Sequence, residues 1–412
     1  MSLLLMLALA HIRGRVRQML VAGLGVALGV GFSIAMAALM QGSQQDFIRQ
    51  LVDTIPHVEI TDELRAPVLQ PAEGVFAATR FFGLRPREDS RGIRNPSAVQ
   101  AALRAWVPGR LAPALRTQAV VQFAGREAGV ALFGVVPDEE AAVSSIAHDF
   151  TLGSFAALLA GGNNIIIGRA LAEKLGAAGG STVGLVTGDG RRRDFRIVGL
   201  FHTGTRPRDE GEVYVALKAA QTLSGRTSAI NTIRIRLDDP SQSRAVAARA
   251  EALIGQKAVS WEEANQPILE ALTVRNIIMY TVVAAIMLVA GFGIFNIVST
   301  ITHEKARDIA ILKSLGFPAR DMRRLFLLEG LMIGAAGSIL GWITGYGLCL
   351  ALQSIPIDLE ELGGATRLPL AWSPLHYILA TVFALLAAGV AGYLPARRAA
   401  AVNPVDIIRG AT

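Results

Sequence analysis

Between positions 301 and 330 the chain reads ITHEKARDIAILKSLGFPARDMRRLFLLEG, a run rich in side chains that could do chemistry. Lys313 and Ser314 resemble the end of a phosphate-binding loop. Such a loop needs Gly-x4-Gly-Lys-Ser/Thr, so that backbone N–H groups can surround the phosphates. Leu312 stands where the second glycine would be needed. We therefore expect this chain not to hydrolyse ATP with its own residues.

The other residue types that serve catalysis or metal binding are scattered. The six histidines lack the spacing of metal ligands, and no Gly-x-Ser-x-Gly nucleophile turn occurs. The single cysteine, Cys349, lies inside an apolar run, so neither an internal disulfide nor a cysteine-based metal site can form. The sequence predicts no catalytic residue, no metal and no cofactor bound by this chain.

The charged run itself has the pattern of a short amphipathic helix. Glu304 with Arg307, and Lys305 with Asp308, lie three residues apart and can pair. Gly316 is expected to end the helix, and Pro318 to prevent its continuation and start the next one. Its apolar side would carry Ile309, Ile311, Leu312 and Leu315, and its polar side Arg307 and Lys313. Two interpretations remain open: a solvated hairpin between membrane spans, or a helix that contacts a partner.

Four apolar runs are long enough to cross a bilayer, which needs about 20 residues. Hydrophobic residues make up 52% of the 412 and the mean hydropathy is +0.43, which fits a membrane protein with a large water-exposed domain. We predict spans at 20–40, 276–300, 325–352 and 375–394.

Lys and Arg residues set the predicted orientation. The net charge of +7 is concentrated in the flanks of the apolar runs, which argues against a nucleic acid partner. These flanks fall on one side if both termini are cytoplasmic. The remaining segments are then a cytoplasmic amphipathic helix (1–19), an extracytoplasmic domain (41–275), a cytoplasmic loop (301–324), a short outer loop (353–374) and a cytoplasmic tail (395–412).

The segment 41–275 has the pattern of a mixed α/β domain. TQAVVQFAG and EAGVALFGVV alternate as two paired strands, and STVGLV and DFRIVGLF flank the Asp-Gly turn of a hairpin. SQSRAVAARAEALIG is expected to be a helix that Gly255 ends. The predicted fold class is therefore four membrane helices with a large mixed α/β domain between the first and second.

Two further sets of residues in the spans have a distinctive pattern. Glycines four residues apart let membrane helices approach closely, either between protomers or among the chain's own spans. These are Gly25, Gly29, Gly337, Gly341 and Gly345. Large adaptable side chains in the first and second spans suggest either a lipid-lined substrate groove or ordinary packing. These are Phe32, Met36, Met40, Met279, Met287 and Phe292.

The charged run resembles the coupling region of ABC-exporter permeases of the MacB/FtsX/LolC–LolE superfamily, whose pattern is roughly ER..EIGILRALG.....I...F..EG. Here the matching residues are Glu304-Lys305, Asp308 to Lys313, Leu315-Gly316 and Glu329-Gly330. The tail LPARRAAAVNPVDIIRG is similar to that family's C-terminus. MQGSQQDFIRQLVDTIPHVEI and SWEEANQPILEAL are closer to the LolC–LolE branch.

This resemblance implies a four-span permease in a bacterial inner membrane. It gives the helix from Glu304 to Gly316 the role of contacting a separate ABC ATPase, expected in two copies, which would hold the ATP and Mg. A second permease protomer, the same chain or a paralogue, and membrane lipid are also implied. The spans would pass the ATPase motion to the outer domain, with lipoprotein release from the membrane as the first expected function.

The resemblance leaves two other functions open. One is MacB-like export of peptides or small amphiphiles with an adaptor. The other is FtsX-like signalling, in which the permease transports nothing and controls a cell-wall hydrolase. The resemblance to LolC implies a long hairpin that recruits a periplasmic lipoprotein carrier. This chain has only TGDGRRR at 187–193, so the resemblance leaves open whether such a carrier is a partner.

Overall fold

The computed structural model describes residues 16–65, 92–226, 228–304, 311, 318–355 and 368–401. These residues form two compact units. The helical unit is drawn from Met1–Asp46, Glu270–Ile357 and Thr366–Thr412. The α/β unit is drawn from Phe47–Leu269 and Asp358–Ala365. The helical unit comes from separate parts of the chain, because residues 47–269 of the α/β unit are inserted between the first and second predicted spans.

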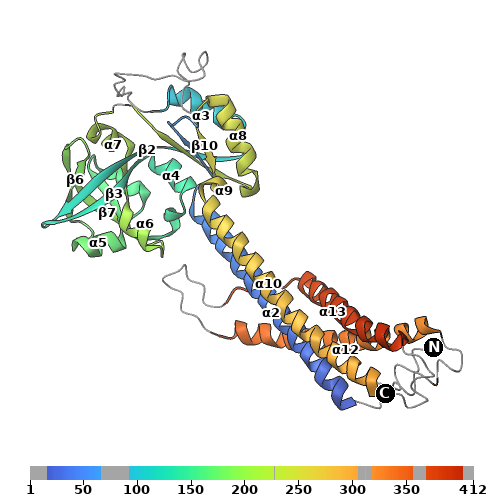
Figure 1. Cartoon of the computed structure of the whole chain (residues 1–412). Helices are drawn as coiled ribbons and strands as arrows, with labels where there is room; N and C mark the ends of the chain where they lie inside the picture. The colour runs from blue at the N-terminus through green and yellow to red at the C-terminus, as the bar shows by residue number, and fades with distance from the viewer. Residues whose placement is uncertain are drawn as a thin grey trace, which may run out of the picture. The chain divides into compact units, whose positions relative to one another are not determined.

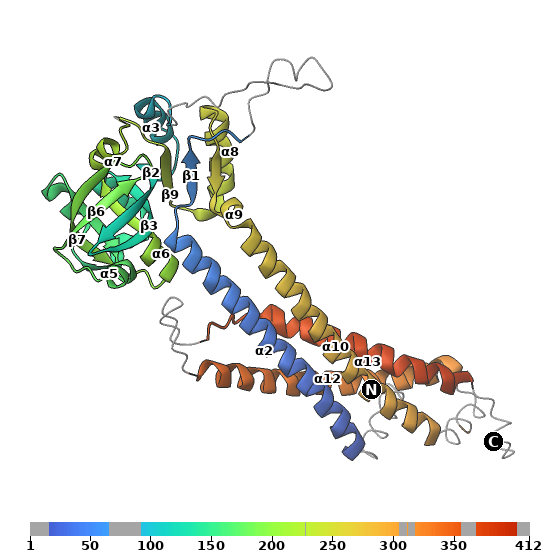
Figure 2. The same cartoon turned by 60° about the vertical axis from the view of Figure 1, so that its left-hand side comes forward.

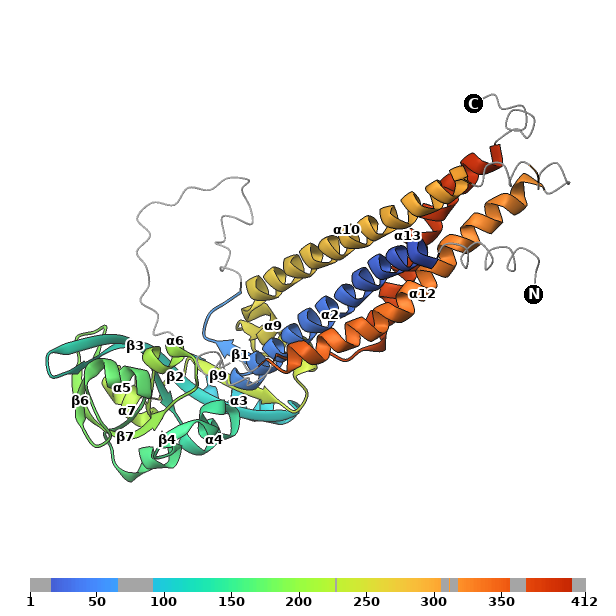
Figure 3. The ribbon, with the colours of Figure 1, turned by 90° about the horizontal axis from the view of Figure 1, so that it is seen from below.

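Four helices among the described residues are long and apolar enough to cross a membrane. They are α2 (Val16–Thr54), α10 (Gln266–Glu304), α12 (Ala319–Gln353) and α13 (Pro374–Ala401). They run alongside one another (Figure 3). The helix α12 begins directly after Pro318, as the sequence predicts. The helices α2 and α10 extend beyond their predicted spans, to Thr54 and from Gln266. Pro267 lies in the first turn of α10, where its missing N–H has no partner inside the helix in any case.

The α/β unit is built around a closed circuit of strands. The strands are β1 (Val58–Thr61), β2 (Gly109–Phe123), β3 (Arg126–Val135), β4 (Phe150–Leu152), β5 (Asn164–Gly168), β6 (Thr182–Thr187), β7 (Arg192–Phe201), β8 (Glu212–Ala216), β9 (Thr232–Leu237) and β10 (Ala258–Ser260). Pairing runs β2–β3–β8–β5–β7–β6 and returns from β6 to β2. This circuit is a barrel, in which β3–β8 and β5–β7 are the parallel pairs.

Apolar side chains fill the barrel, so it has a packed core and no pore. Leu132, Ile165, Leu185, Phe195 and Val213 are all fully buried in one cluster. The helices α5 (Arg169–Leu175) and α7 (Leu217–Leu223) lie at opposite ends of the barrel (Figure 1). The remaining short helices beside it are α4 (Pro137–Val143), η1 (Ser145–His148), η2 (Phe155–Ala160) and α6 (Arg206–Gly211).

A second layer extends the sheet in the order β10–β1–β9–β2, with all pairs antiparallel. The helices α3 (Pro96–Arg104) and α8 (Ser243–Ile254) contribute to its own buried cluster, and Figure 2 shows α8 beside β1 and β9. Gly255 caps α8 in the left-handed conformation (φ 73°), which confirms the predicted helix end. The short helices η3 (Pro240–Gln242) and α9 (Trp261–Ala264) precede α8 and α10.

The local predictions for this unit agree with the structure. The strands β2 and β3 pair in register from Ala114 with Val135 to Phe123 with Arg126. The strands β6 and β7 form the expected hairpin around Asp189 and Gly190, whose φ of 76° suits glycine. The closure of the barrel was not among the predictions.

Candidate functional site

An open apolar groove with a volume of about 650 Å³ lies between α2 and α10 in the helical unit. Drug-sized and cofactor ligands occupy pockets of roughly 300–1,000 Å³, so the volume suits a ligand. We call it the α2–α10 groove. Its lining alternates small and large apolar residues; those used below are Gly25, Leu28, Gly29, Phe32, Val289 and Gly293. No charged side chain lines it, so what it can hold is hydrocarbon.

Glycines form part of the lining of this groove. A Cβ atom added at Gly25 or Gly293 would meet nothing within 4 Å. A Cβ atom at Gly29 would meet Ala290 Cβ at 3.6 Å, an ordinary contact across the two helices. The two helices are therefore in ordinary contact at Gly29, and Gly25 and Gly293 are exposed residues that leave open space beside that contact.

The residues predicted for a substrate groove separate in the structure. Phe32 lines the α2–α10 groove and is 42% exposed. Met279 and Met287 are buried, and Met287 belongs to the core of the helical unit. Met36 and Met40 are partly exposed and Phe292 is 63% exposed, and none of these three is a lining residue. The prediction from large side chains therefore identified one residue that lines the α2–α10 groove, Phe32, and did not assign the glycines to its lining.

The glycines of α12 have a different role from those of α2. A Cβ atom at Gly337 or Gly341 would lie 2.6 Å from Val26 or Val30 Cβ, and one at Gly345 would lie 3.1 Å from Gly31 O. Their absence of side chains lets α12 pack directly against α2 within this chain. The five predicted packing glycines therefore divide: Gly337, Gly341 and Gly345 form the α2–α12 seam, whereas Gly25 and Gly29 line the groove.

Polar contacts tie α2 to α10 and α13 between Met40 and Gln44. Arg275 Nη2 donates to Met40 O (3.3 Å), and Asn276 Nδ2 donates to Gln44 Oε1 (2.8 Å). Gln41 Oε1 lies 2.5 Å from His376 Nε2 at the start of α13. These contacts hold α2, α10 and α13 together at one end of the groove.

Most of the predicted coupling helix lies outside the described residues. This applies to Lys305, Arg307, Asp308, Ile309, Leu312, Lys313, Leu315 and Gly316. Glu304 is the last residue of α10 and is exposed. Ile311 is helical and 47% exposed. The contact of Ile311 and its neighbours with an ATPase therefore stays a prediction.

No sequence pattern indicated the polar network at the end of α2. The last carbonyl groups of a helix have no partner within the helix. Here Thr54 O accepts from Arg208 Nη1 (3.0 Å) and Ser145 Oγ (3.1 Å), and Asp53 O accepts from Arg236 Nη1 (3.2 Å). Val52 O lies 3.3 Å from His57 Nε2. We call His57, Ser145, Arg208 and Arg236 the α2 anchor.

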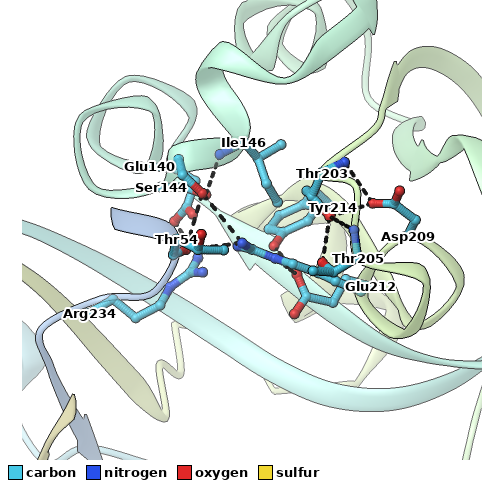
Figure 4. A network of polar contacts seen from close by, with 12 residues as sticks. Thr54, Glu140, Ser144, Ile146, Thr203, Thr205, Asp209, Glu212, Tyr214 and Arg234 are labelled. Atoms are coloured by element: carbon cyan, nitrogen blue, oxygen red, sulfur yellow. Dashed lines mark hydrogen bonds and ion pairs between the residues drawn. The ribbon is translucent and has the colours of Figure 1, made fainter. Parts of the chain in front are cut away.

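Buried groups orient the anchor. Arg208 Nε donates to Glu212 Oε2 (3.0 Å), which also accepts from the Tyr214 hydroxyl (2.6 Å). Figure 4 shows Thr54, Glu212 and Tyr214 in this network. Burial raises the pKa of the Tyr214 phenol, so the hydroxyl keeps the proton that it donates.

His57 links α2 to β9. Its Nδ1 accepts from the Leu237 N–H (3.0 Å), which assigns the proton to Nε2 facing Val52 O. Burial, followed by the charge of Arg236, lowers the pKa of the His57 imidazole, so the neutral form is favoured. A neutral imidazole is the form that can accept and donate at the same time.

A buried ion pair lies beside the anchor. Arg234 Nη2 on β9 contacts Glu140 Oε2 on α4, and both side chains are almost inaccessible to solvent. The Arg234 guanidinium also lies over the Phe133 ring, 5.1 Å from its centroid. Figure 4 shows Glu140 and Arg234 with Ser144. Because α4 packs beside the barrel and β9 belongs to the second layer, this pair fixes the two against each other.

Two family descriptions match the chain. "MacB-like periplasmic core domain" matches residues 19–253, which is more than half of the chain, and "FtsX-like permease C-terminal" matches residues 280–404. The first match covers the α/β unit with the preceding helix, and the second covers the last three spans. The chain thus contains the MacB-like part first and the FtsX-like part second.

Two similar proteins match this chain over nearly their whole length, and a third matches one part of it. The lipoprotein-releasing system transmembrane protein LolC of Neisseria meningitidis is 27% identical, with 93% of this chain and 92% of that protein covered. LolE of Haemophilus influenzae is 24% identical, with 96% of each covered. The macrolide export ATP-binding/permease protein MacB of Azoarcus sp. is 34% identical over 131 residues, which cover 31% of this chain and 18% of that protein.

Among solved structures, the periplasmic region of MacB from Actinobacillus actinomycetemcomitans is 13% identical, with a TM-score of 0.33. It covers 51% of this chain and 91% of that one, and its low score adds nothing to the assignment. The family matches are sufficient alone. The chain belongs to the MacB/FtsX/LolC family of ABC transporter permeases, with a MacB-like periplasmic core domain and an FtsX-like permease C-terminal domain.

Proposed function

We propose that this chain is the permease subunit of an ABC exporter that removes lipid-anchored substrates, lipoproteins first, from a bacterial inner membrane. Both termini would be cytoplasmic, because the Arg-rich segments before α2 and after α13 and the loop after α10 would then share one side. Two copies of a separate ATPase would bind ATP and Mg and press on the segment from Glu304 to Gly316. A second permease protomer would complete the assembly.

The α2–α10 groove is the observation that carries this proposal. A lipid-anchored substrate must place acyl chains against protein before it leaves the bilayer, and a groove lined by Leu28, Phe32 and Val289 offers a hydrocarbon surface. Its glycines leave room for a chain that is flexible and has no fixed shape. An ion or a polar solute would find no partner there, because no charged residue lines the groove.

The relatives support the choice of substrate. LolC and LolE are named for a lipoprotein-releasing system, and they match this chain over most of its length. The MacB-like core domain favours one second candidate, the export of small amphiphiles, because such molecules would fit the same apolar surface. The two candidates differ in what should be found bound to the purified protein.

The test is affinity purification of the tagged full-length chain from its own membranes, with mass spectrometry of bound proteins and acylated species. Lipoproteins together with an ATPase are expected. Gly25→Leu should lower the bound acylated species about tenfold, since a Cβ atom at Gly25 meets nothing within 4 Å and a leucine there would take up space at the groove lining. Gly347→Leu is the matched control, because Gly347 on α12 also has nothing within 4 Å and lies outside the groove.

The outcomes separate the candidates. An ATPase with an adaptor and no lipoproteins would move the assignment to amphiphile export. An ATPase with a cell-wall hydrolase and no membrane substrate would indicate a signalling permease. Equal amounts of acylated species on wild type, Gly25→Leu and Gly347→Leu would show that the groove does not hold the substrate.

A further inference from the structure

The end of α2 is bonded to two parts of the α/β unit that have separate hydrophobic cores. Arg208 lies on α6 and Ser145 on η1, both beside the barrel. Arg236 lies on β9, and His57 precedes β1, both in the second layer. The α2 anchor therefore joins one helix terminus to both layers of the unit, through side chains that are far apart in the sequence.

Charge and hydrogen bonding both favour the contacts between the α2 anchor and the end of α2. A helix carries partial negative charge at its C-terminus, so two guanidinium groups are favourable there. Arg208 is the more buried: its side chain is 15% exposed, and Glu212 and Tyr214 fix its direction. An oriented, buried arginine loses little further freedom when it binds the helix end.

The backbone alone would not provide this firmness. After Thr54 the chain bends through Ile55 and Pro56 before β1 begins at Val58. Pro56 has no N–H group to bond to the helix end. A bend of this kind could pivot and absorb motion of α2. The side chains of the anchor hold the carbonyl groups of Val52, Asp53 and Thr54, which lie just before this bend, in place.

We propose that Arg208 and Arg236 are positioning residues that make the α/β unit follow α2 during the transport cycle; this rests on the proposed exporter function. The helix α2 is uninterrupted from Val16 to Thr54, so a displacement at its membrane end reaches Thr54. With the anchor intact, both layers follow. Without it, ATP would still be hydrolysed, but less of the motion would act on the substrate.

The first measurement tests the anchor itself, without any transport. Spin labels at the exposed positions Arg49 on α2 and Lys218 on α7 would report their distance distribution in the full-length protein. A narrow distribution is expected in the wild type and a broad one in Arg208→Met. Arg206→Met is the matched control, because Arg206 lies on the same short helix with its side chain 85% exposed. A narrow distribution in both Arg208→Met and Arg236→Met would overturn the proposal.

The second measurement tests the consequence. The full chain and its ATPase in lipid vesicles are assayed for ATP hydrolysis and for substrate released per ATP. In Arg208→Met, release per ATP should fall about tenfold, the factor expected when a hydrogen bond to a charged group is lost, while hydrolysis continues. Arg208→Lys should restore part of the release, and Ser145→Ala should cause a smaller loss without leaving a charge unpaired.

The two failures can be distinguished. Unchanged release per ATP in Arg208→Met, Arg236→Met and Ser145→Ala would refute the positioning role, even with an active wild type. A wild type that hydrolyses ATP and releases no substrate would refute the proposed function, and the role in transport with it. If Arg208→Met fails to fold, Ser145→Ala and Arg208→Lys decide, because neither removes the positive charge beside Glu212.

Discussion

Gly341→Ala should destabilise the helical unit although alanine is the better helix former. The added Cβ atom would lie 2.6 Å from Val30 Cβ and Cγ1 and 3.2 Å from Ala27 O. Carbon atoms in contact prefer about 3.5–4.0 Å, so α2 and α12 must separate by about 1 Å. Val30 is fully buried and β-branched, so its side chain cannot turn away. Overpacking of this kind costs about 1–3 kcal/mol.

Gly347→Ala on the same helix isolates the steric effect. Its Cβ atom meets nothing within 4 Å, so it should show only the gain in helix propensity, about 1 kcal/mol or less. The assay is thermal unfolding of the purified full-length chain in one detergent, followed by the fluorescence of its tryptophans. Gly341→Ala should unfold at a lower temperature than wild type, and Gly347→Ala at the same or a higher one. Equal shifts in the two variants would refute the close approach of α2 and α12.

Three further outcomes are expected. The pKa of His57 is lowered in the folded protein, so as the pH decreases below 6.5 the unfolded state binds a proton at His57 before the folded state does. The free energy of unfolding should therefore decrease as the pH is lowered, until the pH is below the pKa of His57 in the folded state. His57→Gln should reduce the difference between unfolding measured at about pH 7.5 and at about pH 5. Arg234→Met should cost about 3–5 kcal/mol in denaturant unfolding, because Glu140 stays buried without its partner, and the double variant with Glu140→Met should recover most of the loss. Ile311→Asp and Leu312→Asp should each abolish pull-down of the ATPase with membrane insertion intact; an unchanged pull-down would contradict the coupling role.

Local patterns were enough to predict the spans and several turns. Hydropathy located the four apolar helices because a membrane helix is recognised from consecutive residues. Gly255 and the Asp189-Gly190 turn were found in the same way, since a positive φ constrains a single position. The barrel could not be found like this. The barrel closes where β2 pairs with β6, with Val121 beside Leu185. The sequence of neither strand indicates which other strand it pairs with.

The site residues show the same limit. The groove prediction used Met279 and Met287 because large adaptable side chains often contact ligands, yet both are buried in the structure. Gly25 and Gly293 line the groove instead, and glycine spacing alone does not distinguish an open groove from a close helix contact. Arg208 carried no signal either, because its role depends on Thr54, which is 154 positions away.

The strand β2 has a consequence for how the α/β unit unfolds. Its first residues pair with β9 in the second layer, and its later residues pair with β3 and β6 in the barrel. Leu111, Ala114 and Leu115 of this one strand belong to three different hydrophobic clusters. Loss of this strand would therefore remove pairing from both layers at once. The unit should therefore melt in a single cooperative transition, with amide hydrogens in both layers exchanging at one common free energy.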